Sequence, residues 1–177
     1  GTGNNSANII KGNSGNNILI GLEGDDILVG KTGTDDMRGG QGNDTYYVYN
    51  VGDQITEIDG EGTDRIRSYI DFDLADAANV ENLELLGSGN LNGTGNNSAN
   101  IIKGNSGNNI LIGLEGNDIL VGNNGDDIFQ INTGAGRDFI FDYDPSGDSI
   151  QLLGGIERNN LNFTYANGNL NIIHFDD

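Results

Sequence analysis

The chain has 177 residues, of which 30 are glycine and one is proline, and its 27 acidic and 8 basic side chains give a formal net charge of −19. Because phosphate binding needs a basic face, this charge argues against nucleic acid as a partner. The absence of cysteine excludes disulfides, zinc–thiolate sites and a thiol nucleophile. We expect neither a membrane span nor a signal peptide. The chain begins inside a repetitive stretch and is expected to be a piece of a larger protein.

A long repeat divides the chain into two similar blocks. Residues 1–30 and 93–122 are identical except at one position, where Asp25 corresponds to Asn117. Such near-identity indicates recent duplication, and duplicated units of this size usually stack. The apolar content of 34% would by itself favour disorder, and the repeat argues against that interpretation.

Within each block a shorter repeat recurs every nine residues. It places glycine at the first and fourth positions, Asp or Asn at the sixth and a large apolar residue at the eighth, as in residues 21–29 (GLEGDDILV). Gly-x-x-Gly is typical of a tight turn, and the last three residues are typical of a short strand. Six turn residues and three strand residues would form half a coil, so eighteen residues would complete one coil.

The pattern therefore predicts an all-β fold, a right-handed parallel β-roll (β-solenoid) with strands about 4.7–4.9 Å apart. The eighth residue of each repeat would face inward, in a core one side chain deep on each sheet. So thin a core would not offset the ordering of so much glycine, at about 1–2 kcal/mol per residue, so the roll needs another source of stability. The predicted inward residues are Ile10, Leu19, Leu28, Met37, Tyr46, Ile102, Leu111, Leu120 and Phe129.

The sixth position supplies a candidate for that source. On stacking, every second sixth-position acid would lie on the same edge, about one strand spacing from the next, where bare carboxylates repel. A hard divalent cation between coils would reverse that repulsion. Calcium fits best, because it takes six to eight oxygen ligands in irregular geometry, whereas magnesium demands an octahedron. A single His and no Cys exclude a transition-metal array. The acids in this register are Asp26, Asp35, Asp44, Asp53, Asp118 and Asp127.

The nonapeptide at residues 39–47 (GGQGNDTYY) resembles the repeat of the RTX (repeats-in-toxin) family, a calcium-dependent parallel β-roll. The resemblance implies several calcium ions and no catalytic residues. It also implies a secreted, extracellular protein of Gram-negative bacteria whose partners are calcium, the rest of the parent protein and the type I secretion machinery. Such a domain would fold on meeting extracellular calcium and would support secretion and stability. Similar repeats that lack only the second glycine occupy residues 21–29, 30–38, 113–121 and 122–130.

The resemblance also implies a set of ligands. One turn would offer the carbonyls of its first and third residues, and the turn one coil away those of its second and fourth, with carboxylates from the sixth position. One such site would join Gly21, Glu23 and Asp26 to Gly40, Gly42 and Asp44, and a second would lie between Asn17 and Gly30, Thr32 and Asp35. The further residues implied in metal binding are Gly24, Gly33, Asp53, Gly62, Asp64, Asn109, Gly113, Glu115, Gly116, Asp118, Gly122, Asn124, Gly125, Asp127, Gly136, Asp138 and Asp148.

Three segments resemble less regular parts of such rolls. Residues 52–66 and 134–140 are similar to longer variant coils, and residues 142–150 are similar to the segment that closes rolls in secreted proteases and lipases. In the first variant coil, Glu57 and Glu61 are either additional ligands near Asp64 or exposed surface residues.

Two features depart from the repeat. Asn replaces the sixth-position acid in the first two repeats of each block, and it brings no charge, so we expect weak or empty sites with Asn side chains hydrogen-bonding up the stack. Outward-facing apolar residues in strands such as 18–20 and 27–29 reflect either strand propensity or a covered face, for example in face-to-face self-association. The substituted positions are Asn8, Asn17, Asn100 and Asn109.

We divide the chain into a first roll block (1–66), an insertion within one continuous solenoid (67–92), a second roll block (93–150) and C-terminal capping strands (151–177). In the insertion, residues 73–79 favour a helical turn and residues 80–86 a strand. Alternating apolar residues around Asn167-Gly168 predict a β-hairpin that caps the roll.

Catalysis has little support in the sequence. The single histidine, His174, has no Ser or Cys pattern near it and is interpreted as structural or surface-exposed. The periodic acids are better explained as metal ligands than as a glycosidase pair. The alternative to a calcium-folding module is a carbohydrate-binding or adhesive surface module of a polysaccharide-modifying enzyme or adhesin.

Overall fold

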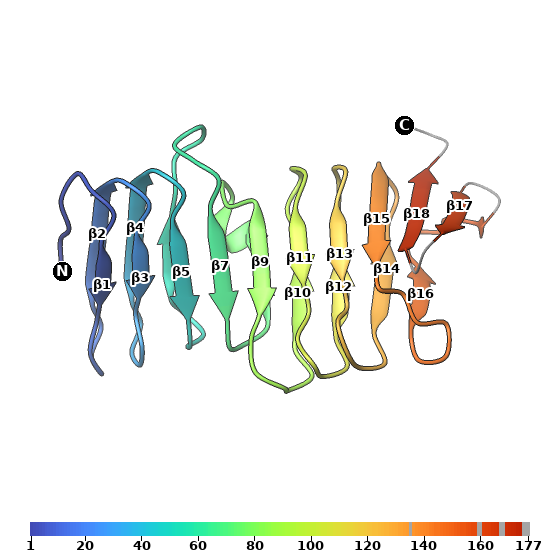
Figure 1. Cartoon of the computed structure of the whole chain (residues 1–177), viewed down its shortest axis with the longest axis horizontal. Coiled ribbons are helices and arrows are strands. Elements are labelled where there is room, and N and C mark those ends of the chain that lie inside the picture. Colours follow the sequence, from blue (N-terminus) through green and yellow to red (C-terminus); the bar gives the residue numbers. More distant parts are fainter. Residues whose placement is uncertain (135, 159–160, 167–168, 175–177) are drawn as a thin grey trace. The chain divides into compact units, whose positions relative to one another are not determined.

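The computed structural model describes residues 1–134, 136–158, 161–166 and 169–174, and in them it confirms an all-β solenoid of stacked parallel strands (Figure 1). The chain divides into two compact units, which are described separately. Unit 1 contains Gly1–Ile70 and Leu74–Glu84, and unit 2 contains Asp71–Asp73 and the chain from Leu85 onward. No helix in the described residues is long and apolar enough to cross a membrane.

Unit 1 has two parallel sheets whose strands alternate along the chain. In the larger sheet Ile10, Leu28, Tyr46 and Ile66 are aligned on successive strands, and in the smaller one Leu19, Met37 and Ile55 are aligned. The larger sheet has the order β1 (Ile9–Lys11), β3 (Ile27–Val29), β5 (Thr45–Val48), β7 (Arg65–Ser68) and β9 (Asn82–Leu85), and the smaller one β2 (Ile18–Glu23), β4 (Asp36–Gln41) and β6 (Gln54–Thr56).

Unit 2 repeats this arrangement with a different ending. One sheet has the order β8 (Phe72–Asp73), β10 (Asn92–Thr94), β12 (Ile110–Ile112), β14 (Ile128–Ile131) and β16 (Ser149–Leu152), all parallel. The other contains the parallel strands β11 (Ile101–Lys103), β13 (Ile119–Val121) and β15 (Arg137–Phe141), followed by β18 (Asn169–His174) and β17 (Leu161–Ala166).

The C-terminal hairpin is confirmed. Strand β18 is antiparallel both to β15 and to β17, so the hairpin extends the sheet at the end of unit 2. The predicted turn at Asn167-Gly168 lies outside the described residues. The side chain of His174 also lies outside the part of the chain that the structure describes.

The predicted inward ladder forms the core. Eight of the nine predicted residues are buried, and the ninth, Ile10 on the first strand, is half-buried. A strand of three residues presents only its middle side chain inward. The core is therefore one residue deep on each sheet, as the repeat predicted, and it lacks the depth of an ordinary globular core.

Residues 67–92 contain the two elements that the sequence predicted there. The helical turn predicted at 73–79 is a 3-10 turn, η1 (Leu74–Ala77), whose Leu74 and Ala77 are buried, and the strand predicted at 80–86 is β9, while β8 is an additional strand. The end of this stretch begins a repeat at residues 86–94, because Gly93 is aligned between Phe72 and Leu111. The sequence pattern missed this repeat, since its inward residue is glycine and its sixth residue is Leu91.

Candidate metal sites

Stacking places the sixth-position carboxylates in ladders. In unit 1, Oδ1 of Asp26 accepts a hydrogen bond from the backbone N–H of Asn8 (2.6 Å), one coil earlier. Asp44 accepts from Asp26 (2.6 Å) and Asp64 from Asp44 (2.7 Å) in the same way. Each carboxylate thus uses one oxygen to hold the preceding coil. The same bond links Asp35 to Asn17, Asp53 to Asp35, Asp118 to Asn100, Asp138 to Asp118, Asp127 to Asn109 and Asp148 to Asp127.

The second oxygen of five of these carboxylates has no partner. In each case Oδ2 is buried and makes no hydrogen bond, and each residue is at most 1% exposed. A buried carboxylate oxygen without a donor is costly, because it has lost water and gained nothing in return. A cation would satisfy all five in the same manner, so the donor set fits a hard divalent ion. The five are Asp26, Asp35, Asp44, Asp118 and Asp127.

The first-position glycine creates the space beside the unpartnered oxygen. A Cβ added to Gly21 would collide with Oδ2 of Asp26 and with the carbonyl oxygen of Gly39 in the next coil. An added Cβ on Gly113 would likewise collide with Oδ2 of Asp118. Carboxylate and carbonyl oxygens therefore gather at a point that only glycine leaves open, and both are ligand types that calcium prefers.

The acidic turns also have an unusual backbone. Their second residues have positive φ even where they are not glycine, as at Leu22 (92°), Lys31 (73°), Leu114 (75°) and Asn123 (67°). In the nine-residue turns of Asp26, Asp35, Asp44, Asp118 and Asp127, the fourth-position glycines have positive φ as well. Positive φ in bulky residues is costly and persists where the surroundings require it. These five Asp turns thus share one strained conformation.

The fourth-position glycines also allow the coils to approach closely. A Cβ on Gly33 would lie 2.7 Å from the carbonyl carbon and oxygen of Gly15, and one on Gly42, Gly62 or Gly136 would collide with the carbonyl oxygen one coil earlier. The residues implied as third-position ligands would contribute their backbone carbonyls, since their side chains are exposed. These are Glu23, Thr32, Glu115 and Asn124.

The Asn-bearing turns are closed differently. Oδ1 of Asn8 accepts the backbone N–H of Asn4 (2.7 Å), and Oδ1 of Asn100 accepts that of Asn96 (2.8 Å). Neither the second nor the fourth residue of these turns has positive φ. The same closure occurs at Asn17, which accepts from Asn13, and at Asn109, which accepts from Asn105. Stacking therefore brings Asn17 next to Asp35, as the predicted second site required, but the Asn17 oxygen already has a donor.

Side chains also accept hydrogen bonds between coils at the fifth position, which the nine-residue pattern did not single out. Asn43 N–H donates to Oδ1 of Asp25 (2.7 Å), and Asp126 N–H donates to Oδ1 of Asn108 (3.1 Å). At the sixth position, Nδ2 of Asn109 donates to the carbonyl of Leu91 in the preceding coil (2.7 Å). The recurrence of Asp and Asn at the fifth position was the available signal.

Two predicted ligands at the ends of their ladders have both oxygens engaged. Oδ2 of Asp53 accepts from the N–H groups of Tyr49 (3.3 Å) and Asn50 (3.2 Å). Oδ2 of Asp148 accepts from the N–H of Asp144 (2.8 Å). Their spacing does not distinguish them from the other acids, but their turns are closed in the manner of the Asn turns.

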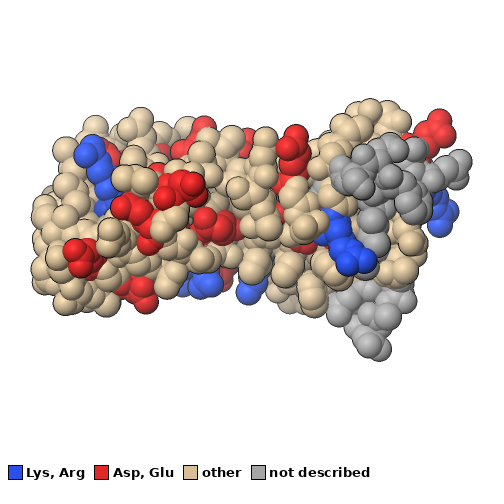
Figure 2. Space-filling view, turned by 90° about the horizontal axis from the view of Figure 1, so that it is seen from above, with Lys and Arg blue, Asp and Glu red and all other residues tan. Residues whose placement is uncertain are grey.

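Burial dominates the electrostatics of the ladders. It raises the pKa of Asp44, Asp64, Asp118 and Asp127 to about 6 in each case, against partial compensation by backbone N–H donors. Burial, reinforced by neighbouring acids, raises the pKa of Glu57 to about 8. Acidic side chains recur across the face shown in Figure 2, where basic ones are sparse. Without a cation the ladders resist ionisation.

The fold and the donor sets together define a β-solenoid whose acidic turns fit a cation. A comparison with protein families matches the RTX calcium-binding nonapeptide repeat (4 copies) at residues 2–37, 11–46 and 94–129. The chain therefore belongs to the RTX calcium-binding repeat family, whose β-roll is a structural calcium-binding module. No curated protein matches the chain significantly.

Proposed function

We propose that this chain folds on binding extracellular calcium and supports the type I secretion and the folding and stability of a larger secreted protein. The observation that carries the proposal is the set of five buried carboxylate oxygens without a hydrogen-bond partner. In the absence of cations these oxygens oppose folding. With calcium bound between coils, the same oxygens would become ligands, and binding free energy would become folding free energy.

Because calcium is scarce in the cytosol, the coupling of folding to calcium would leave the chain unfolded inside the cell and folded outside it. An apo chain with a net charge of −19 and a core one side chain deep has little to hold it folded. An unfolded chain can pass through a secretion channel, and calcium outside the cell would then order it. Calcium, the rest of the parent protein and the export machinery are the partners of this proposal.

A calcium titration followed by far-UV circular dichroism tests the folding part. We expect a disordered spectrum in chelator and a cooperative gain of β signal as calcium is added, with magnesium much less effective. A roll that is already fully formed in chelator would overturn the coupling of folding to calcium.

The secretion part needs a separate assay. The chain is fused behind an inert reporter and exported through a type I apparatus into medium with calcium or with chelator. We expect more folded, protease-resistant reporter in the calcium medium. Equal yields in the two media would count against a role for calcium-driven folding in export.

A second candidate function, glycan binding, has one specific observation in its favour. A groove of about 670 Å³ on the outer face of unit 1 is lined by Ile9, Lys11, Ile27, Val29, Lys31, Thr32, Tyr47 and Tyr49. The Tyr49 ring stacks on Tyr69 with centroids 4.7 Å apart. Aromatic faces with lysines nearby suit an anionic sugar, so a panel of acidic polysaccharides in calcium tests this candidate. Binding that survives Tyr49→Ala would exclude the groove.

The exposed apolar residues leave self-association as a further proposal. Ile9 is 65% exposed and Ile18 56% exposed on the outer strand faces. A partner roll would cover them, whereas strand propensity alone would leave them in water. Sedimentation of the calcium-loaded chain distinguishes the two, since a monomer at all concentrations would remove the partner roll.

A further inference from the structure

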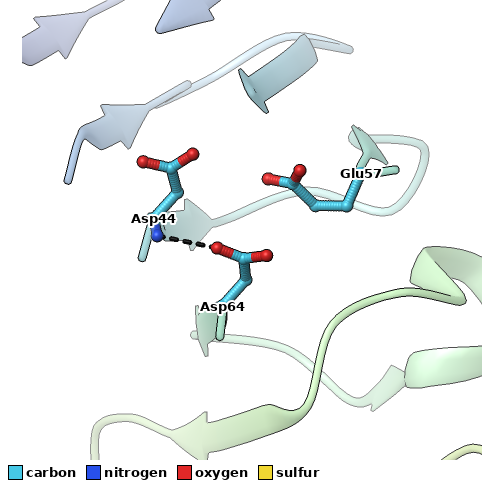
Figure 3. A group of neighbouring side chains, drawn as sticks. All are labelled: Asp44, Glu57 and Asp64. Atoms are coloured by element: carbon cyan, nitrogen blue, oxygen red, sulfur yellow. Dashed lines mark hydrogen bonds between the residues drawn. The ribbon is translucent and has the colours of Figure 1, made fainter. Parts of the chain in front are cut away.

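Three carboxylates converge in the longer coil of unit 1. Asp44, Glu57 and Asp64 each place an oxygen within 4.8 Å of the others (Figure 3). Asp44 precedes β5, Glu57 directly follows β6 and Asp64 precedes β7. Asp44 and Asp64 belong to the ladder of sixth-position acids, but Glu57 lies outside that register. The cluster thus adds a carboxylate where the repeat pattern predicts none.

The free oxygens of this cluster point into it. Asp44 is fully buried; its Oδ1 faces the N–H of Asp26, and its Oδ2 has no hydrogen-bond partner. A Cβ added to Gly39 would collide with both Oδ2 of Asp44 and the hydroxyl of Tyr46, so these two atoms are neighbours. The Tyr46 hydroxyl in turn donates to Oε1 of Glu57. Oδ2 of Asp44 therefore lies beside the Glu57 carboxylate, whose own Oε2 is buried without a partner.

No ion pair among the described residues offsets the charge of this cluster. The ion pairs found among the described residues, Arg38 with Asp36 and Arg67 with Glu84, involve none of the three acids. The backbone of Glu57 is held in place, because Nδ2 of Asn79 donates to its carbonyl oxygen (2.8 Å). The structure thus holds a third carboxyl group at a place where two others already lack a counter-ion.

Unit 2 contains an equivalent coil without this feature. Asp118 and Asp138 are twenty residues apart, as Asp44 and Asp64 are. The residues that correspond to Tyr46 and Glu57 are Leu120 and Ile131, which are both buried. Where unit 1 has the polar pair Tyr46 and Glu57, unit 2 has two apolar residues. The coil of unit 2 is therefore a natural control for the coil of unit 1.

We propose that Asp44, Glu57 and Asp64 form a three-carboxylate calcium site that binds more tightly than the two-carboxylate steps of the ladders and fills first. The proposal rests on calcium binding by the acidic turns and adds Glu57 as a ligand that the nonapeptide does not supply. Calcium affinity rises with the number of carboxylate ligands, and a third one here needs no rearrangement. The Tyr46 hydroxyl orients the Glu57 carboxylate toward the ion.

Calorimetric calcium titration of the full chain and of Glu57→Gln tests the site. The amide retains the shape of Glu57 and a bond to Tyr46 but removes the charge. We expect the tightest class of calcium binding to weaken at least about tenfold. Asp59→Asn, which removes one exposed charge from the same loop, should leave that class unchanged. If Glu57 is only a protonated partner of Tyr46, Glu57→Gln will bind calcium like the wild type, and the proposal is overturned.

Terbium provides a second readout that does not depend on the Glu57 variant folding. The chain has no tryptophan, so bound Tb³⁺ is sensitised by tyrosine, and Tyr46 contacts the proposed site. The first equivalent of Tb³⁺ should show strong tyrosine-sensitised emission that Tyr46→Phe largely removes and Tyr47→Phe retains. First-equivalent emission unchanged in Tyr46→Phe would place the tightest site elsewhere.

A double variant sharpens the comparison between units. Tyr46→Leu with Glu57→Ile gives the unit 1 coil the residues of unit 2, and it should lower the affinity of the tightest site to that of the remaining ones. If the wild type shows no calcium-induced folding, the proposed function has failed. If folding persists and none of these variants changes the tightest class, only the three-carboxylate site has failed.

Discussion

The Asp turns and the Asn turns share their glycine spacing but are closed by different means. Oδ1 of Asn8 takes the N–H of Asn4 in its own turn, whereas the matching oxygen of Asp26, one coil later, is buried without a donor. The backbone follows this difference, since Leu22 has a φ of 92° and Asn4 has no positive φ. One turn type satisfies itself, and the other leaves its oxygen for a cation.

The difference shows that one side-chain group decides how a turn is stabilised. An amide has an N–H₂ that can donate, as Nδ2 of Asn109 does to the carbonyls of its surroundings, and it carries no charge. A carboxylate only accepts, and its charge in a buried position must be offset. The Asn turns in the first coil of each block are therefore satisfied by their own hydrogen bonds, and we expect ions only at the coils that follow.

The largest expected effect comes from replacing a shared carboxylate. Asp118→Asn should raise the calcium concentration at the folding midpoint about tenfold or more, because it removes a charged ligand. In chelator the same substitution should have the opposite sign and stabilise any residual roll, since it removes an uncompensated buried charge. Circular dichroism of the variant, once with calcium and once with chelator, measures the two effects. Destabilisation in both would show that the Asp118 oxygen has a partner other than a cation.

The pH dependence of the apo chain follows from the raised pKa values. Four buried carboxyls have a pKa of about 6 against an ordinary value of 3.8, so the folded state binds protons more tightly than the unfolded state. Their favourable contribution is complete below pH about 4 and is lost as pH rises through about 6. In chelator, β signal should therefore increase from pH 7 to pH 5. A flat profile would contradict the burial of these groups.

A pair of glycine substitutions tests the backbone difference. Gly33→Ala should destabilise the calcium-loaded roll by about 2–3 kcal/mol, because φ is 117° and the added Cβ would press on the Gly15 carbonyl. Gly15→Ala, at the same place in the Asn turn one coil earlier, meets only an ordinary contact with Asn13 and should cost less than about 1 kcal/mol. Urea unfolding in calcium measures both. Equal losses would mean that the two turns share one conformation.

The last pair of substitutions falls in Asn turns. Asn109→Asp replaces an Nδ2 donor, 2.7 Å from the carbonyl of Leu91, with an oxygen that repels it. This should cost about 1–3 kcal/mol in calcium. Asn8→Ala should cost less, since Asn8 is half-buried whereas Asn109 is buried. A gain of a calcium ion in Asn109→Asp, measured by calorimetry, would show that the turn can convert to the acidic type.

Most of the fold could be predicted from the nine-residue pattern. It predicted the inward residues from Leu19 to Phe129, because a three-residue strand leaves no choice of which side chain faces inward. It also predicted that Asp26 and Asp44 would meet, since eighteen residues make one coil. The repeat at residues 86–94 was missed because Gly93 has no side chain to mark the core.

The site was predictable only in part. Periodicity identified the acids but treated Asp53 and Asp148 like the rest, and their closure depends on nearby backbone N–H groups that spacing does not describe. Glu57 lies outside the nine-residue register, so its proximity to Asp44 depends on the path of the longer coil. The positive φ at Leu22 could not be predicted either, because leucine has no preference for that backbone conformation.

A calcium-loaded crystal structure of this chain tests the central difference most directly. We expect calcium at about 2.3–2.6 Å from Oδ2 of Asp26 and of Asp118. We also expect Oδ1 of Asn8 and of Asn100 to keep their hydrogen bonds to Asn4 and Asn96. Fully occupied calcium on those Asn oxygens, or calcium missing from Asp26 and Asp118, would show that the two turn types do not differ in this way.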